Sequence, residues 1–547
     1  MGQSHSSDRF RTHSVQNQPP PLEPYDAWTS DPVLRAHVQA GGGLSARSTL
    51  QAYGALVGGE LGGLGTAANE HRPQLRAYDR YGHRIDRVEF HPAYHRLMEQ
   101  AIAHGVHSLA WNDPQPGAHV ARAGLSYLHH QADAGTSCPL TMTFAAAPLL
   151  RGQSTIAALW HERATSCSYD PRHVPAAEKD GVTLGMGMTE KQGGSDVRSN
   201  STRATVEGDH YRLVGHKWFF SAPMSDAFLV LAQAPEGLTC FLLPRILEDG
   251  TANAIRILRL KDKLGDWSNA SSEVEFEDAL AWRVGEPGRG VATIIEMVAL
   301  TRLDCALGSA AEIRQAFVRA LHHVRHRSAF GKALIDQPLM RNVIADLALE
   351  SEAATALAFR VARAIDAAPR DPHEAALARL ATPVAKYWVC KRAPAVVNEA
   401  QECLGGAGYV EDSVLPRLYR QAPLNSIWEG AGNVQCLDVL RALARQRDAL
   451  DAMFAEFERC RGAHMAFDRA VASLRTALDS SDRLELRARR ITERIALVLT
   501  ATVLLQSGSG AAETFCRTRL DSQHGITLGT LPRDAPVDAL IDAAWAP

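Results

Sequence analysis

The chain has 547 residues, of which 46% are hydrophobic and 22% charged, and its formal net charge is −3. This length allows several domains and large buried cores. The near-neutral charge excludes a protein coated with positive charge, so any contact with nucleic acid must come from a local patch. The nine cysteines form no CxxC pair and no zinc-type cluster with histidine. We therefore expect reduced thiols, no metal site and a cytoplasmic location.

The first 24 residues are polar and end close to three consecutive prolines, which predicts a flexible tail. From 25 to 180 the apolar pattern is mostly helical, most clearly over 93–109. The longest apolar run, residues 495–505, is too short to span a bilayer and indicates a buried helix. We therefore expect no membrane contact.

Strand-like runs replace the helical pattern between residues 181 and 285. A turn sequence at 207–210 joins two of them as a hairpin. The runs are 182–184, 204–206, 211–214, 218–220, 228–232, 238–243 and 273–276. They predict a central antiparallel β-domain.

Helical periodicity returns near residue 290 and continues to about 505. The predicted helices are 290–327, 338–367, 373–403, 433–460, 464–478 and 483–506. Helices and strands are therefore segregated along the chain, which is typical of an α+β fold. Its predicted parts are an N-terminal helical domain (25–180), the β-domain (181–285), a helical bundle domain (286–445) and an extra C-terminal helical domain (446–547).

Two sequence motifs lie in the β-domain. Residues 188–196 read MTEKQGGSD, a glycine-rich loop whose backbone a ligand can approach closely. Residues 216–221 read HKWFFS, which alone would be a core strand. The first motif is not a Rossmann fingerprint, because GxGxxG is absent and no helix is predicted to follow.

Together the two motifs resemble those of the acyl-CoA dehydrogenase flavoproteins. The resemblance implies an acyl-CoA dehydrogenase-like fold and FAD as the cofactor. It also implies that both motifs contact the flavin ring. The implied residues are Met188, Thr189, Gly194 and Ser195 from the first motif, and Trp218, Phe219 and Ser221 from the second.

Three further motifs follow in the order that this family has. Residues 327–337 resemble the family's R-x-x-F-G…Q segment, which implies that Arg327, Phe330 and Gln337 contact the FAD of a neighbouring subunit. An arginine and an amide side chain suit phosphate and adenosine recognition. The turn at 404–409 implies FAD contacts by its glycines, and 427–433 corresponds to the segment with the catalytic base. The implied residues are Gly405, Gly406 and Gly408 in the turn, Asn433 for the cofactor and Glu429 as the base.

Some relatives place the base on the preceding helix instead. Here the corresponding residues 300–303 read Leu-Thr-Arg-Leu, without a carboxylate. Glu429 is therefore the only candidate for removing the α-proton of an acyl thioester.

Finer details resemble the AidB-type adaptive-response flavoproteins, over roughly residues 45–505. They include Lys191 in the first motif, Trp428 before the base, and about 100 residues beyond it. This branch implies a role in the response to DNA alkylation and a C-terminal domain that binds double-stranded DNA. We also expect a homotetramer.

The arginines near residue 490 offer partial support for DNA binding. The segment 483–494 contains five Arg and two Glu, a local charge of +3. On a continuous helix, four of these arginines would lie within about 60° of one another and could follow a phosphate backbone. They are Arg483, Arg487, Arg490 and Arg494. The alternative is an ordinary solvated helix face.

The sequence thus favours an FAD-containing, DNA-associated protein that protects DNA from alkylating agents. Weak dehydrogenase activity on short or branched acyl-CoA can coexist with that role, so acyl-CoA is a second candidate partner. The alternative is an ordinary metabolic acyl-CoA dehydrogenase that uses Glu429 and has no role at DNA.

Overall fold

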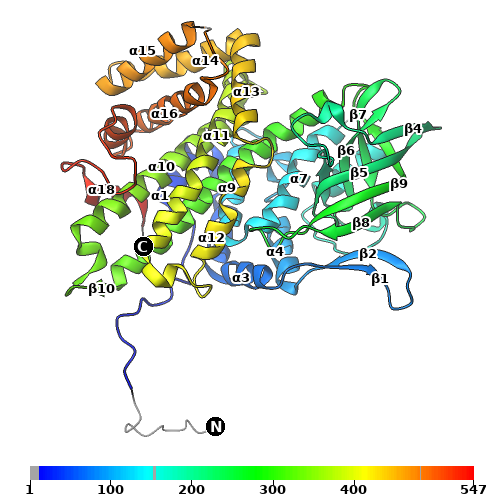
Figure 1. Ribbon diagram of the computed structural model, residues 1–547, viewed down its shortest axis with the longest axis horizontal. Helices are drawn as coiled ribbons and strands as arrows, with labels where there is room; N and C mark the ends of the chain where they lie inside the picture. Colours follow the sequence, from blue (N-terminus) through cyan, green and yellow to red (C-terminus); the bar gives the residue numbers. More distant parts are fainter. Residues whose placement is uncertain (1–11, 152–154, 481, 547) are drawn as a thin grey trace.

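The computed structural model describes residues 12–151, 155–480 and 482–546. A large block of helices lies beside a β-domain (Figure 1). Helices, strands and helices follow one another along the chain, so the predicted α+β class is confirmed.

The N-terminal region is mostly helical. Its helices are α1 (Pro32–Ala40), α2 (Arg47–Leu56), α3 (Gly62–Glu70), α4 (Pro92–Ala103), α5 (Leu109–Asn112), α6 (Ala118–Ala132), α7 (Ala134–Leu150) and α8 (Thr155–Ala164). Asp31 and Asp133 cap α1 and α7, because each side chain accepts a hydrogen bond from a backbone N–H of the first turn. The helix predicted over 93–109 is interrupted after α4, where Gly105 has a φ of 73°.

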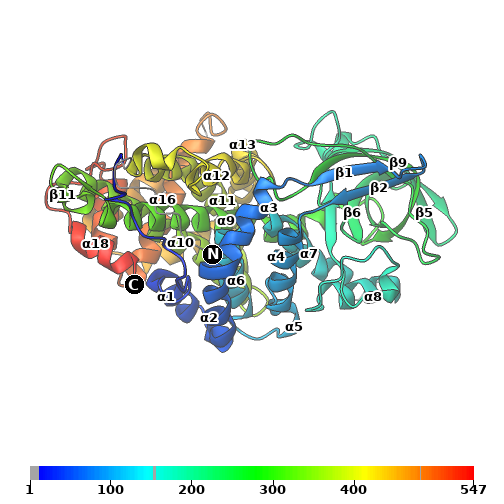
Figure 2. The ribbon, with the colours of Figure 1, turned by 90° about the horizontal axis from the view of Figure 1, so that it is seen from below.

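A hairpin in this region was not predicted. Its strands, β1 (Gln74–Tyr78) and β2 (Arg84–Glu89), pair antiparallel. Most of their side chains are exposed or half-buried, so the sequence carries no apolar alternation that would reveal them. The hairpin lies along the β-domain (Figure 2), where Arg84 donates a hydrogen bond to the carbonyl oxygen of Ile257 at 3.1 Å.

The β-domain contains the predicted strands and hairpin. Its strands are β3 (Leu184–Gly187), β4 (Arg203–Glu207), β5 (His210–Ser221), β6 (Ala227–Ala234), β7 (Gly237–Pro244), β8 (Ile255–Leu260) and β9 (Ser271–Val284). The sheet closes on itself, because β6 pairs with both β4 and β7. It is mainly antiparallel, but β3 and β4 both run parallel to β6. The loop 188–202 returns the chain to the start of the sheet, so that β4 runs in the same direction as β3 on the other side of β6.

The helical bundle contains three long helices at nearly the predicted positions, α9 (Gly290–His326), α10 (Pro338–Ala367) and α11 (Pro372–Cys403). Their short connections make neighbours antiparallel, so α9 and α11 run in the same direction. Two shorter helices follow, α12 (Leu415–Gln421) and α13 (Gly432–Arg445).

The C-terminal extension is helical, but two predicted helix boundaries are wrong. Its helices are α14 (Arg447–Glu458), α15 (Met465–Asp479), α16 (Ala488–Gln506), α17 (Ala512–Phe515) and α18 (Val537–Ala544). The helix predicted over 433–460 breaks at Gln446, whose backbone is not helical. The helix predicted from 483 begins only at Ala488. The apolar side of α16 belongs to the same core as α10 and α11, so the extension is not packed independently of the bundle.

Residues 17–24 of the predicted tail contact the helical bundle, and residues 1–11 lie outside the described part. Asn17 exchanges two hydrogen bonds with the backbone of Ser328, at 2.8 and 2.7 Å. Glu23 pairs with Arg319 of α9. These polar contacts hold an extended segment that carries no helix or strand pattern.

The described residues contain neither a candidate membrane span nor a candidate metal cluster. None of the described helices has both the length and the apolar character needed to cross a bilayer. In the same residues, no group of three or more His, Cys, Asp and Glu is arranged to hold a metal ion.

Candidate active site

The two predicted flavin-contacting motifs meet at one end of the β-domain. The backbone N–H of Trp218 donates a hydrogen bond to the carbonyl oxygen of Thr189 at 2.8 Å. Gly194 packs so closely on Thr189 that a Cβ at position 194 would lie 2.3 Å from its hydroxyl oxygen. Met188 and Thr189 are half-buried, whereas Gly194 and Ser195 are exposed to solvent. The structure therefore brings these predicted residues together.

A buried ion pair joins the two motifs, and the sequence interpretation did not include it. Glu190 Oε1 lies 2.8 Å from Lys217 Nζ, and both side chains are fully buried. Glu190 also accepts hydrogen bonds from Ser201 and Thr202, and Lys217 donates one to the carbonyl oxygen of Leu231. Burial alone would raise the pKa of Glu190, but Lys217 and these donors hold it well below its usual range. Glu190 and Lys217, the E and K of the two motifs, thus have a structural role.

Aromatic side chains are available beside this loop for a planar ring. The pairing of β5 with β9 is irregular between Lys217 and Phe220, at Trp218 and Phe219. Trp218 is half-buried under Lys261, whose Nζ lies 3.4 Å from the centre of the indole ring, and Phe219 is 53% exposed. Ser221 is half-buried and lies within hydrogen-bond distance of Ser271. These accessible groups fit an isoalloxazine ring.

The predicted base lies in a loop before α13. The Thr301 hydroxyl of α9 donates a hydrogen bond to Glu429 Oε2 at 2.5 Å. The segment 300–303, which has no carboxylate, thus supplies a hydrogen-bond partner for Glu429. Trp428, the residue before the base, and Met188 of the loop 188–202 both pack against one apolar cluster that includes residues of α7, the β-domain and α9.

The loop backbone around the base is held by side chains that the sequence interpretation missed. Glu429 has a φ of 57°, an unfavourable conformation for a residue with a Cβ. Arg302 and Gln435 donate to its carbonyl oxygen at 3.1 and 3.0 Å. Lys386 donates to the carbonyl oxygens on both sides, those of Trp428 and Gly430. Such strain at a fixed carboxylate is typical of an active site.

The environment of the carboxyl group tunes its acidity. Burial raises the pKa of Glu429 above its usual value, while the hydrogen bond from Thr301 and the charges of Arg302 and Lys386 oppose the rise. A raised pKa makes a carboxylate a stronger base, which suits abstraction of a weakly acidic C–H proton.

The other predicted cofactor residues lie at the far end of the bundle. Thr301 and the end of α9 are separated by 25 residues of helix, about 38 Å, so Arg327 is remote from Glu429. Likewise Lys386 and the end of α11 are about 26 Å apart, and Gly405 follows that end. One chain therefore does not bring these segments to its own base. This agrees with the expectation that the segment 327–337 serves a neighbouring subunit.

The far end presents exposed groups that fit part of a large cofactor. Arg327 donates to the carbonyl oxygen of Asn17 at 2.7 Å, and Phe330 is 98% exposed. Gln337 donates to the carbonyl oxygen of Ala329. A Cβ at Gly405 or Gly406 would meet no described atom within 4 Å, so the backbone is open to a ligand there. Gly408 instead packs on Gln401, where a Cβ would lie 2.2 Å from the carbonyl oxygen.

Asn433 contacts the C-terminal extension. It lies in the first turn of α13, and its amide oxygen accepts a hydrogen bond from Arg489 Nε of α16 at 2.8 Å. The C-terminal extension therefore reaches the loop that follows the base.

The four predicted DNA-binding arginines do not form one helical row. Arg483 precedes α16 and has a φ of 46°, and Arg487 is the residue before the first turn. Arg487 donates to the carbonyl oxygens of Ala477 and Ser480, which ties it to the end of α15. Only Arg490 and Arg494 belong to the helix. The predicted helix does not extend over residues 483–487, because these residues form the turns that connect α15 to α16.

The sequence and the fold are similar to those of known proteins. Residues 17–171 match the Adaptive response protein AidB N-terminal domain, and 185–279 and 288–444 match the middle and C-terminal domains of acyl-CoA dehydrogenases. AidB of Escherichia coli (strain K12) is 49% identical over 525 residues, 95% of this chain and 96% of that protein. Acyl-CoA dehydrogenase family member 11 of Caenorhabditis elegans is 32% identical over 79% of this chain and 72% of that protein. The crystal structure of C. elegans ACDH-11 in complex with C11-CoA matches with a TM-score of 0.85 at 27% identity, over 99% of this chain and 94% of that one.

The chain therefore belongs to the acyl-CoA dehydrogenase family of FAD-dependent oxidoreductases. Within the family it is of the AidB type, as its N-terminal domain and its likeness to the E. coli protein show. The predicted resemblance, fold class and cofactor are confirmed at the level of this family.

Proposed function

We propose that the chain removes two hydrogens from the α and β carbons of a short or branched acyl thioester. The observation that supports this best is the carboxyl group of Glu429, which the Thr301 hydroxyl holds by a hydrogen bond. Glu429 takes the α-proton, and bound FAD supplies the acceptor for the hydride that leaves the β-carbon. The electron pair of the α C–H bond becomes the new C=C bond.

The residues next to the base support the proposed preference for short acyl chains. Asp304 lies one helical turn beyond Thr301 on the same face of α9. It pairs with both ends of the Arg122 guanidinium and accepts a hydrogen bond from Thr141 at 2.6 Å. The guanidinium carbon of Arg122 lies 3.6 Å from the centre of the Phe144 ring. This buried polar cluster fills the space between α9, α6 and α7 one helical turn from Thr301, and we propose that it limits the length of the acyl chain.

Anaerobic mixing of the FAD-loaded protein with thioesters of different length tests the proposal. We expect isovaleryl-CoA to bleach the flavin at least 10-fold faster than decanoyl-CoA, because a long chain would have to desolvate or displace the Asp304–Arg122 pair. The absorbance of oxidised flavin is the measurement. Equal rates for both thioesters would show that the acyl chain does not extend toward the Asp304–Arg122 pair. Bleaching by neither would contradict the proposed reaction.

We further propose that the protein associates with double-stranded DNA and shields it from alkylating agents. The likeness to an adaptive response protein supports this role. Arg483 and Arg490 are exposed, and neither forms an ion pair within the described residues, so both charges are available to phosphates. A homotetramer would repeat the exposed pair Arg483 and Arg490 on each copy. A second copy would also bring the segment near Arg327 to the site around Glu429, from which it is remote within one chain.

Charge reversal tests the DNA role without removing the extension, whose helices share the main core. We expect Arg483→Glu with Arg490→Glu to weaken binding of a duplex oligonucleotide at least 10-fold. The slope of log affinity against log salt should fall by about 2, one for each lost phosphate contact. Arg533→Glu, an exposed position outside α16, is the matched control. Equal losses in both variants would point to general charge repulsion, and no loss in either would contradict the assignment.

A further inference from the structure

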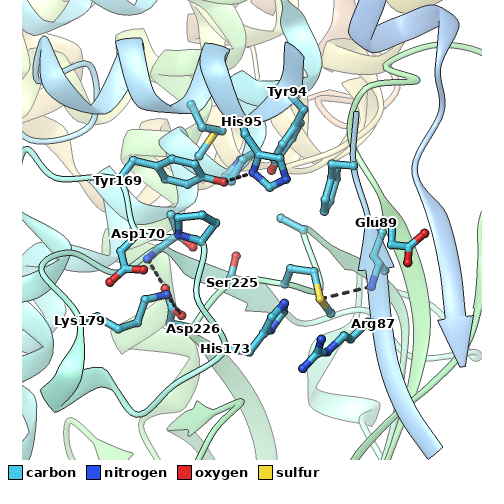
Figure 3. A pocket seen from close by; sticks show the side chains of 18 residues that line it. Arg87, Glu89, Tyr94, His95, Tyr169, Asp170, His173, Lys179, Ser225 and Asp226 are labelled. Carbon is cyan, nitrogen blue, oxygen red and sulfur yellow. Dashed lines mark hydrogen bonds and ion pairs between the residues drawn. The ribbon is translucent and has the colours of Figure 1, made fainter. Parts of the chain in front are cut away.

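A cavity of about 370 Å³ lies on the N-terminal side of the β-domain (Figure 3). It is enclosed by β2, the first turns of α4, the loop 169–179 and the turn 222–226. Its described lining includes none of the residues assigned above to the base, the cofactor or DNA. The volume is at the lower end of the range for small-molecule sites, about 300–1,000 Å³.

Two cations share one buried carboxylate in its wall. Lys179 Nζ lies 2.6 Å from Asp226 Oδ1, and Arg245 Nη2 lies 3.9 Å from the same oxygen. Lys179 and Asp226 are almost completely buried, and Arg245 largely so. Burial raises the pKa of Asp226 although both cations oppose the rise. At least one positive charge therefore remains without a matching negative charge.

The other charged groups around the cavity do not supply that negative charge. Glu89 is paired with Arg76 at 2.9 Å, and Asp170 is paired with Arg172 at 2.6 Å. Arg87 reaches the cavity from β2 and forms no ion pair among the residues that the structure describes. The cavity thus has an excess of positive charge.

Two neutral hydrogen-bond donors, His173 and Ser225, lie on the same side of the cavity as Arg87. Arg245 Nη1 lies 2.7 Å from His173 Nδ1, and an arginine can only donate, so the proton of the neutral ring is on Nε2. Burial, assisted by neighbouring cations, lowers the pKa of His173 to about 4, which keeps the ring neutral. The Ser225 hydroxyl is buried and has no hydrogen-bond partner among the described residues. Figure 3 shows Arg87, His173 and Ser225 on one side of the cavity.

The opposite side is aromatic and apolar. The rings of Phe90 and Tyr94 stack with their centres 4.0 Å apart and their planes at 17°. Met98 and Pro139 continue this surface. A ligand that satisfied both sides would have an anionic group at one end and a flat apolar group at the other.

We propose that this cavity binds a small aromatic carboxylate. The carboxylate accepts hydrogen bonds from Arg87, His173 and Ser225, and the aromatic ring packs against Phe90 and Tyr94. This site is separate from the dehydrogenase site and does not depend on its chemistry.

Calorimetric titration of the FAD-loaded protein with phenylacetate tests the proposal. We expect one phenylacetate to bind per chain, and 2-phenylethanol and inorganic phosphate to bind at least 10-fold more weakly, because each offers only half of the ligand. Arg87→Gln should weaken phenylacetate at least 10-fold, since it removes a charge-assisted hydrogen bond. Ser225→Ala should weaken it about 3-fold.

Arg80→Gln on the same hairpin is the matched control, since Arg80 is exposed and does not line the cavity. It should bind phenylacetate as the parent does, and so should Glu429→Gln, which separates this site from the proposed reaction. Unchanged binding in Arg87→Gln would overturn the proposal. Equal binding of 2-phenylethanol would rule out recognition of the carboxylate, and equal binding of phosphate would rule out the aromatic part.

Discussion

Glu429→Gln is expected to slow bleaching of the flavin by isovaleryl-CoA by about 10²–10⁴-fold, the usual contribution of a positioned base. The amide keeps the shape of the side chain and still accepts a hydrogen bond from Thr301, but it cannot take a proton. Binding of the thioester should change much less than the rate of bleaching, because binding of the acyl group does not depend on the charge of Glu429. Single-turnover absorbance measurements separate the rate of bleaching from the binding step.

The pH dependence gives a second test of the same residue. The base acts in its ionised form, so the rate should rise with pH through the raised pKa of Glu429. The hydrogen bond from Thr301 lowers that pKa, so Thr301→Val should move the rising limb to higher pH. Thr293→Val, on the same helix but away from the base, should leave it in place.

Two outcomes would contradict the assignment. A bleaching rate in Glu429→Gln close to that of the parent would mean that another group removes the proton. A shift of the limb to lower pH in Thr301→Val would mean that the hydrogen bond does not act on the carboxylate.

The local sequence was sufficient for the long elements. The helices α9, α10 and α11 were predicted nearly to the residue, because each is long and periodic and ends at proline or turn residues. The motif segments could be recognised from their glycines. Gly194, for example, packs so closely on Thr189 that a larger residue would not fit there. These features depend on neighbours close in the sequence.

The missed features depend on contacts between distant segments. Lys386 holds the base loop from 42 residues away, and nothing in its own surroundings marks it. The hairpin β1–β2 has mostly exposed side chains, so no apolar pattern reveals it. Arg483 and Arg487 have helix-compatible spacing, but the connection between α15 and α16 requires turns there. The spacing of side chains along the sequence predicts a shared helix face only for residues that lie within the helix.

Lys217→Met is expected to destabilise the protein by about 3–5 kcal/mol at neutral pH, because it leaves the buried carboxylate of Glu190 without its partner. The burial of Lys217 itself lowers the pKa of its ammonium group, a cost that Glu190 partly offsets. Urea unfolding followed by circular dichroism measures the loss. Because Glu190 and Lys217 adjoin Thr189 and Trp218, the variant should also retain less FAD during purification.

The loss should shrink as the pH falls. Without Lys217, the pKa of Glu190 in the folded state rises above that in the parent, because burial then loses its main opposing contact. A carboxyl group with a raised folded pKa favours folding as it becomes protonated, so the variant gains relative stability when the pH drops below that pKa. Lys191→Met, an exposed neighbour in the same loop, should be close to neutral at every pH. Adding Glu190→Gln to Lys217→Met should recover part of the stability, since the unpaired charge is then gone while an acceptor for Ser201 remains. If the single variant is as stable as Lys191→Met, the ion pair does not hold the two motifs together.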